Sequence, residues 1–154
     1  MEIKKLKNRP DIDQYKKLNA SYNQLNKFLI ELRSRELPDK TANLINREID
    51  QLNQVSGLEK ELRKQIKQTQ SLMIKLIERE HKLVTKNHYR NTWLIIGMAA
   101  FGIPLGAAFG TGLGNMAFLG IGLTFGMVIG IAVGTRMDKI ALQEGRQIDF
   151  EIKH

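Results

Sequence analysis

The stretch from Trp93 to Thr135 contains 43 consecutive residues without one charged side chain. A helix needs only about 20 residues to cross a hydrocarbon core about 30 Å thick, so this stretch is long enough for two spans. Gly110–Asn115 can form the turn between them, because glycine and asparagine adopt left-handed backbone angles readily. The sequence therefore predicts two membrane-spanning helices, near residues 91–110 and 116–135.

Glycine recurs at every fourth position in both predicted spans. An interval of four keeps residues on one face of a helix, and glycines turn that face into a groove in which another backbone can lie. Lipid tails are as apolar as leucine, so such close packing is a main source of attraction between helices in membranes. We expect helix packing at these glycines: Gly102, Gly106, Gly110, Gly114, Gly122, Gly126, Gly130 and Gly134.

The glycine grooves can close within one chain or between copies of it. Both spans carry further small residues outside the two series, including Gly97, Gly120 and Ala132, so more than one face of each helix can approach a neighbour. We therefore expect a homo-oligomeric bundle. Pro104 interrupts the hydrogen bonding of the first span and predicts a bend there, either a hinge or a static kink. Gly57 is a second candidate hinge, between two predicted soluble helices.

The segments GIPLGAAFGTGLG and GLTFGMVIGIAVG resemble the two-helix segments of bacterial glycine-zipper membrane proteins. The resemblance covers the 43 apolar residues and none of the remaining chain. It implies oligomerisation within the bacterial inner membrane, and some related zippers line channels or pores. Small two-span effectors that permeabilise membranes have a similar outline. The lipoprotein form, anchored through an N-terminal cysteine, does not apply, because the chain has no cysteine.

Charge is distributed unevenly along the chain. Residues 1–91 carry 20 Lys and Arg against 12 Asp and Glu, whereas residues 135–154 carry four of each. Lys and Arg near the ends of spans are retained on the cytoplasmic side, so both termini are expected in the cytoplasm. No apolar signal sequence precedes the spans. We expect contacts with the membrane interface, including anionic lipid phosphates, from Tyr89, Arg90, Trp93, Arg136 and Lys139.

Helical periodicity also dominates residues 1–90, so the chain is predicted to be all-α. After a loosely ordered basic lead, apolar residues recur at steps of three and four, the spacing of a coiled-coil seam. Leu37–Pro38 ends this first helix, and the second runs to Val55 and can pair with the first as a hairpin. A third, continuous helical stalk should then lead into the membrane. The expected coiled-coil seam comprises Tyr15, Leu18, Tyr22, Leu25, Leu29 and Leu32.

The part after the spans, residues 136–154, is predicted to be a cytoplasmic tail. Residues 136–144 form a short helix ended by Gly145, and the alternating residues 146–152 form either a short strand or a docked extended arm. Nothing in the chain matches a catalytic, nucleotide-binding or metal-binding motif, so we expect no enzyme activity, no cofactor, no metal and no small-molecule substrate. His81 and His88 are spaced two turns apart on a charged face.

The basic stalk, Lys60–Arg90, holds nine basic and three acidic residues. It can be a solvated coiled-coil face, a surface for anionic lipid, or a site for a polyanionic or protein partner. Two functions remain for the whole chain. The first is an oligomeric ion-permeable pore or channel, assembled by the glycine zipper and the coiled coil. The alternative is a non-conducting membrane anchor or scaffold that recruits cytoplasmic partners.

Overall fold

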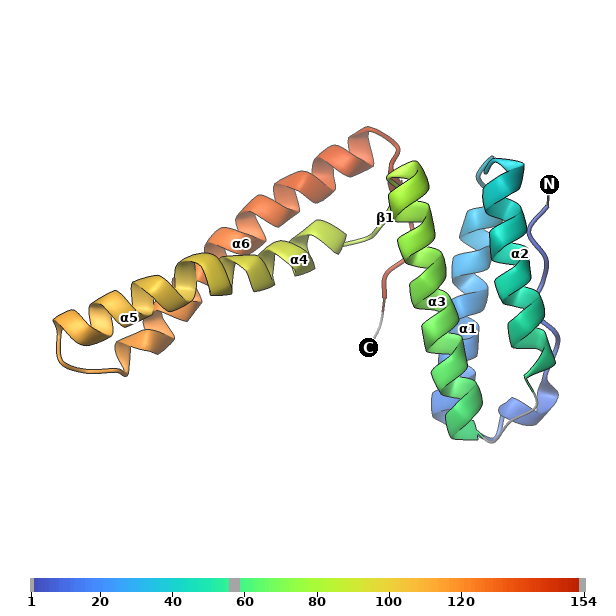
Figure 1. Cartoon of the computed structure of the whole chain (residues 1–154), viewed down its shortest axis with the longest axis horizontal. Coiled ribbons are helices and arrows are strands. Elements are labelled where there is room, and N and C mark those ends of the chain that lie inside the picture. Colours follow the sequence, from blue (N-terminus) through green and yellow to red (C-terminus); the bar gives the residue numbers. More distant parts are fainter. Residues whose placement is uncertain (1, 56–58, 153–154) are drawn as a thin grey trace. The chain divides into compact units, whose positions relative to one another are not determined.

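A computed structural model describes residues 2–55 and 59–152, so Gly57 lies outside the described residues. The described chain is all-helical apart from two short strands (Figure 1). It divides into two compact units, the first formed by Met1–Thr85 with Ile148–His154 and the second by Lys86–Gln147. In chain order the elements are η1 (Pro10–Ile12), α1 (Lys16–Arg33), α2 (Asp39–Gln54), α3 (Glu59–His81), β1 (Val84–Thr85), α4 (His88–Gly97), the π-helical turn η2 (Met98–Gly102), α5 (Ile103–Gly112), α6 (Phe118–Gln143) and β2 (Gln147–Ile148).

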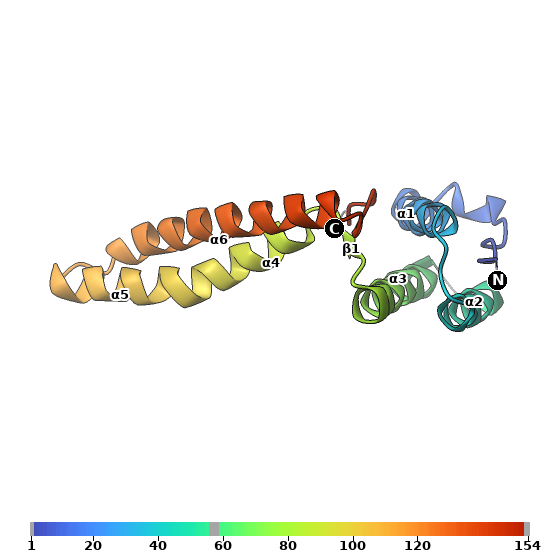
Figure 2. The ribbon, with the colours of Figure 1, turned by 90° about the horizontal axis from the view of Figure 1, so that it is seen from above.

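Helix α3 packs against both α1 and α2, and Figure 2 shows the three helices at the corners of a triangle. Of the predicted seam, Leu18, Leu25, Leu29 and Leu32 are buried in the core of this first unit. Tyr22 is partly buried, whereas Tyr15 precedes α1 and is 40% exposed. The seam of α1 is thus one wall of a three-helix core. The expected helix break at Leu37–Pro38 is confirmed, since α2 begins directly after Pro38.

Residues 2–9 form an extended segment that we call the N-terminal strap, and it bridges α1 and α2. The Asn46 side chain accepts a hydrogen bond from the backbone N–H of Lys4 at 2.7 Å and donates one to the carbonyl of Glu2 at 3.0 Å. From α1, the Arg33 side chain donates to the carbonyls of Ile3 and Lys4. The expected loose lead is therefore wrong, because side chains satisfy the strap backbone and Ile3 is buried in the core.

The strap provides a test on a single helix. Asn46→Ala is expected to destabilise the first unit by about 1–3 kcal/mol, because it removes both amide hydrogen bonds to the strap from a site that is 3% exposed. Asn43→Ala, at an exposed position of the same helix, is the matched control and should change stability by less than about 0.5 kcal/mol. Urea unfolding of the full chain in detergent, followed by circular dichroism, measures the stability of both variants. If the two variants are equally stable, the hydrogen bonds between Asn46 and the strap do not stabilise the first unit.

The end of the chain completes the core of the first unit. Strand β2 pairs with β1, and Ile148 is fully buried. Phe150 is 6% exposed and packs on Phe28 of α1, with ring centroids 5.1 Å apart. Both alternatives for the tail are therefore present, a short strand followed by a docked arm. The short helix expected over residues 136–144 is instead the end of α6, which finishes at Gln143. Gly145, the expected stop, follows it with a positive φ of 69°.

The expected continuous stalk is wrong. Helix α3 ends at His81, and Lys82 and Asn87 both take left-handed backbone angles, with φ of 55° and 60°. Between them the β-branched pair Val84–Thr85 forms β1 and is buried. Extended pairing with β2 competes with helix here, and β-branched residues favour the strand.

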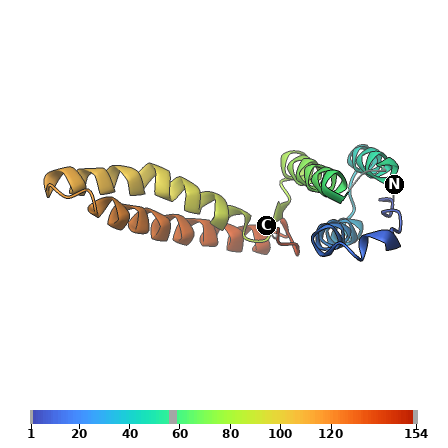
Figure 3. The same ribbon diagram turned by 90° about the horizontal axis from the view of Figure 1, so that it is seen from below.

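The second unit is a helical hairpin. One arm runs through α4, η2 and α5, and it packs along its length on α6, the other arm (Figures 1 and 3). Gly114 in the turn has a φ of 64°, and the Asn115 side chain accepts a hydrogen bond from the N–H of Ala117. Both arms, His88–Gly112 and Phe118–Gln143, are long and apolar enough to cross a membrane. They extend beyond the expected spans at their polar ends, because residues 136–143 continue α6 without a break.

Candidate functional site in the apolar hairpin

The two glycine series face each other inside one hairpin. A Cβ added at Gly126 would lie 2.5 Å from the carbonyl oxygen of Gly97 and 2.6 Å from the backbone nitrogen of Gly102. One added at Gly106 would lie 2.8 Å from the Cα of Leu119. Real Cβ atoms almost never come so close to backbone, so only glycine permits this separation of the helices. The buried glycines of the hairpin are Gly97, Gly102, Gly106, Gly110, Gly122, Gly126, Gly130 and Gly134.

Gly97 belongs to this interface although it lies five residues before Gly102 and thus outside the four-residue series. The π-helical turn η2 explains its position, because such a turn takes one more residue than an α-helical turn. The extra residue brings Gly97 back onto the face that carries Gly102. Pro104 follows the turn near the start of α5, and Ile103 N–H bonds the carbonyl of Met98. A π-helical turn thus lies just before Pro104, while the predicted bend and hinge at Pro104 stay predictions.

The sequence predicts that Gly114 packs between helices, but the structure contradicts this prediction. It lies in the turn at a positive φ, and a Cβ added there would meet nothing within 4 Å. Its role is conformational, because L side chains are strained at such a φ. Gly120 lies on α6 itself and is also open, with nothing within 4 Å of an added Cβ. The four-residue spacing alone does not show where a helix ends and its turn begins.

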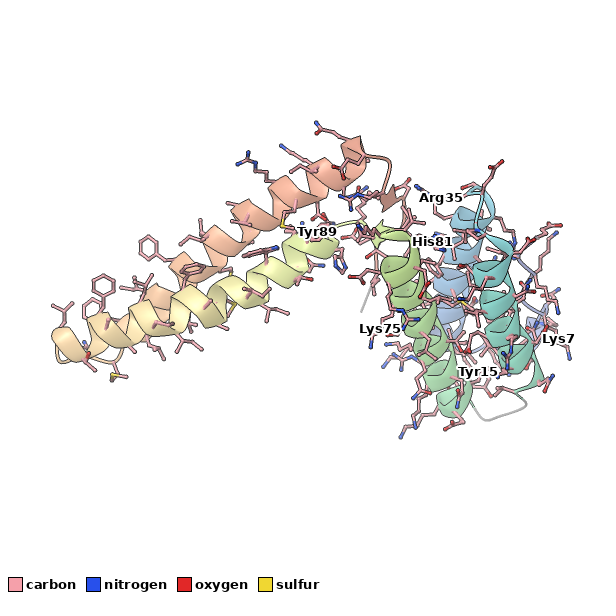
Figure 4. All side chains as sticks on the ribbon, turned by 45° about the horizontal axis from the view of Figure 1, so that its top comes forward. Lys7, Tyr15, Arg35, Lys75, His81 and Tyr89 are labelled. Atoms are coloured by element: carbon pink, nitrogen blue, oxygen red, sulfur yellow. The ribbon has the colours of Figure 1, made fainter. Side chains whose placement is uncertain are left out.

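The outward surface of the hairpin is apolar, and Figure 4 shows side chains projecting from both arms. Ile95 is 68% exposed, and Phe109 and Phe125 are each more than half exposed. The Thr124 hydroxyl donates to the carbonyl of Gly120 on its own helix at 3.0 Å. The Thr111 hydroxyl likewise bonds the carbonyl of Ala107. These hydroxyls satisfy local backbone, and the exposed apolar side chains suit a hydrocarbon environment.

At the polar end of the hairpin, Asp138 of α6 holds the first turn of α4. Its two carboxylate oxygens accept hydrogen bonds from the backbone N–H groups of Tyr89 and Arg90, at 3.0 and 2.9 Å. Asp138 is only 7% exposed. The first N–H groups of a helix lack partners within it, and a carboxylate there also interacts favourably with the helix dipole. Asp138 therefore closes the hairpin from the opposite arm.

Sequence reasoning missed Asp138, although a signal was present. It is the first acidic residue after Glu80, so it stands alone in a long stretch without carboxylates. Nearby, the guanidinium of Arg146 donates hydrogen bonds to Glu144, and these bonds, followed by one with the Tyr89 side chain, raise the pKa of Arg146 above its ordinary value. Arg146 is thus positively charged at every physiological pH.

Asp138→Ala is expected to destabilise the hairpin by about 2–3 kcal/mol, because it leaves two N–H groups at the start of α4 without their charged acceptor. Lys139→Ala is the control, since Lys139 is the next residue and is exposed. Resistance of the purified chain to unfolding in mixed detergent measures the difference. Identical unfolding of the two variants would contradict the assignment of Asp138.

The other residues expected to contact the membrane interface lie near the same end of the hairpin. Trp93 is partly buried, and its carbonyl faces Gly130. Arg136 and Lys139 are exposed on α6. In the first unit, His81 Nε2 lies 2.8 Å from the hydroxyl of Thr41, so this histidine contributes to packing between α3 and α2. Among the residues that the structure describes, no three His, Cys, Asp or Glu side chains converge as metal ligands would.

Comparisons of the chain with protein-family models, with curated proteins and with solved structures found no match.

Proposed function

We propose that this chain is a two-span membrane anchor, in which the glycine-packed hairpin holds the helical first unit at one face of a bilayer. The pairing of β1 with β2 carries this proposal. These strands flank the hairpin in sequence, at Val84–Thr85 and Gln147–Ile148, so both ends of the hairpin must emerge on the same side. Two antiparallel spans satisfy this requirement, whereas a single span would separate Ile148 from the core that buries it.

The glycine packing supports an anchor more strongly than a pore. An anchor alone needs only one span and no glycine series, which by itself favours a pore. In this fold an anchor does require two spans and a glycine series. The two spans return the chain to the first unit, and the buried glycines allow the spans to pack closely. The interior of the hairpin is filled by backbone contact, and its outward hydroxyl groups bond their own helices. We therefore place the anchor ahead of the pore.

Thiol accessibility tests the anchor directly, because the chain has no cysteine and each introduced one is unique. Single cysteines replace Asn8 in the strap, Leu113 in the turn and Gln143 at the end of α6, all exposed positions. In sealed vesicles, an impermeant thiol reagent should reach Asn8→Cys and Gln143→Cys from one side and Leu113→Cys only from the other. Labelling of all three from one side would exclude the two-span arrangement.

A second candidate is the pore, and one observation favours it. Ala100, Pro104 and Ala108 form an exposed row of small residues on the first arm, and Gly120 with Thr124 forms another on α6. Neither row is used inside the hairpin, so further hairpins could pack against them. A bundle of such hairpins would resemble glycine-zipper pores. Ions would then pass through a channel between the chains and not through the interior of one hairpin.

The two candidates are separated by ion flux in reconstituted vesicles and by Gly120→Leu. This variant blocks the outer row while leaving the hairpin closed, because nothing lies within 4 Å of a Cβ at Gly120. A pore should leak ions and lose that leak in Gly120→Leu. If the chain is an anchor, neither the unchanged protein nor Gly120→Leu should make the vesicles leak ions.

A further inference from the structure

Helix α3 carries a basic face, which we define as Lys60, Arg63, Lys64, Lys67 and Lys75. The spacings of three, four and seven residues place these side chains on one side of the helix. Four of them surround a shallow hollow whose other lining residues are Glu61, Gln68 and Ser71. Glu61 flanks the face, and no acidic residue follows it until Glu78. Figure 4 shows the labelled side chain of Lys75 pointing away from the helices.

The cations of this face differ from the other cations of the first unit in their ion pairing. Elsewhere in the first unit Lys4 pairs with Asp50, Arg35 pairs with Glu31, and Arg33 binds strap carbonyls. Within the described ranges, by contrast, no carboxylate pairs with any cation of the basic face of α3. The Nε atom of Arg63 is buried and has no hydrogen-bond partner there. The exposed cations that line the hollow without a carboxylate partner form a surface suited to phosphate oxygens.

We propose that the basic face of α3 docks on the anionic lipid head groups of the membrane that the hairpin crosses, an inference that rests on the anchor function. Six residues, Lys82–Asn87, join α3 to α4. Even fully extended they reach only about 20 Å, so they tether the C-terminal end of α3 near the start of the hairpin. The basic face lies about 9 to 32 Å further along α3, and it meets the head groups when α3 lies along the bilayer surface. Such tethering raises the effective concentration of head groups, and weak charge attraction then suffices for docking.

Two observations favour lipid over nucleic acid as the partner. Helix α3 contains no Phe, Tyr or Trp, and its one imidazole, His81, lies beside Thr41 of α2, whereas single-stranded nucleic acids are bound largely by stacking on aromatic side chains. Leu72 is 55% exposed next to Ser71, which is among the residues lining the hollow. An apolar side chain beside cations is typical of surfaces that insert slightly into the head-group layer.

A fluorescent probe on the full chain tests the docking. An environment-sensitive dye is attached to Ser71→Cys, within the basic face, or to Asn43→Cys, exposed on α2. Each protein is reconstituted into vesicles of phosphatidylcholine alone or mixed with phosphatidylglycerol. The Ser71→Cys dye should shift to the blue only with the anionic lipid, and the Asn43→Cys dye in neither. The shift should disappear at high salt, since the screening length falls from about 10 Å at 0.1 M to about 3 Å at 1 M.

Charge variants identify the face. Each Lys near an anionic leaflet changes the docking equilibrium about fivefold, so K60Q/K64Q/K67Q should lower the ratio of docked to undocked protein about 100-fold. K5Q/K17Q/K27Q removes the same charge from exposed lysines elsewhere in the first unit and should leave the dye shift in place. Equal losses in both triple variants would overturn the proposal, as would a Ser71→Cys dye that responds to added RNA but not to anionic lipid.

Flotation of the vesicles at alkaline pH separates this inference from the anchor function. If the chain floats with both lipid mixtures and the Ser71→Cys dye is insensitive to composition, the docking is wrong and the anchor stands. If the chain floats with neither, the anchor itself fails and docking fails with it.

Discussion

Gly130→Ala is expected to weaken the closed hairpin by about 2 kcal/mol, whereas Gly120→Ala on the same helix leaves it unchanged or stabilises it. A Cβ at Gly130 would collide with the carbonyl oxygen of Trp93 and lie 2.8 Å from its carbonyl carbon and 3.0 Å from the Cα of Leu94. All three are backbone atoms, so the two arms must separate. The same methyl at Gly120 meets nothing within 4 Å.

The identical chemistry of these two substitutions makes the comparison sharp. Alanine favours a helix over glycine by about 1 kcal/mol at either position. If the two substitutions change the stability of the hairpin in opposite directions, the difference therefore comes from packing between the arms. The measurement is the midpoint of unfolding in a titration from mild to denaturing detergent, with intrinsic Trp93 fluorescence as the signal. If both variants unfold together, the arms of the hairpin do not meet at the glycines and the central feature of the second unit is wrong.

Phe150→Ala should destabilise the first unit by about 3–5 kcal/mol, although it lies close to the end of the chain. The ring is 6% exposed and packs against Phe28, which is fully buried, so its removal leaves a cavity beside α1. Terminal residues of a loosely ordered tail would show no such effect. Thermal unfolding followed by circular dichroism provides the measurement.

Ile152→Ala is the matched control for Phe150→Ala, because Ile152 lies two residues further on and is 36% exposed. It should change stability by no more than about 0.5 kcal/mol. A large loss in Phe150→Ala also bears on the anchor function, since it shows that the chain needs its last residues to rejoin the first unit after the hairpin. If Phe150→Ala is as stable as the control, the return of the chain no longer requires two spans.

Local patterns in the sequence predict most of the helices, the break at Leu37–Pro38 and the apolar hairpin, but not the end of α3 at His81. Periodicity shows which face of a helix is apolar or free of side chains, since that face depends only on neighbouring residues. It therefore predicts that Leu25 and Leu29 are buried and that eight glycines form a surface for helix packing, of which all but Gly114 lie between the arms. It could not show which partner covers such a surface.

The sequence by itself thus determined the all-helical class, the two spans long enough for a membrane and the excess of positive charge before them. Only the tertiary structure decided that the glycine faces meet within one chain, that Asp138 caps the opposite arm, and that the strap and Phe150 complete the first unit. These contacts join residues far apart in sequence, such as Lys4 with Asn46 and Arg90 with Asp138. They leave no periodic trace, because one carboxylate or amide at the right place in space satisfies a distant backbone group.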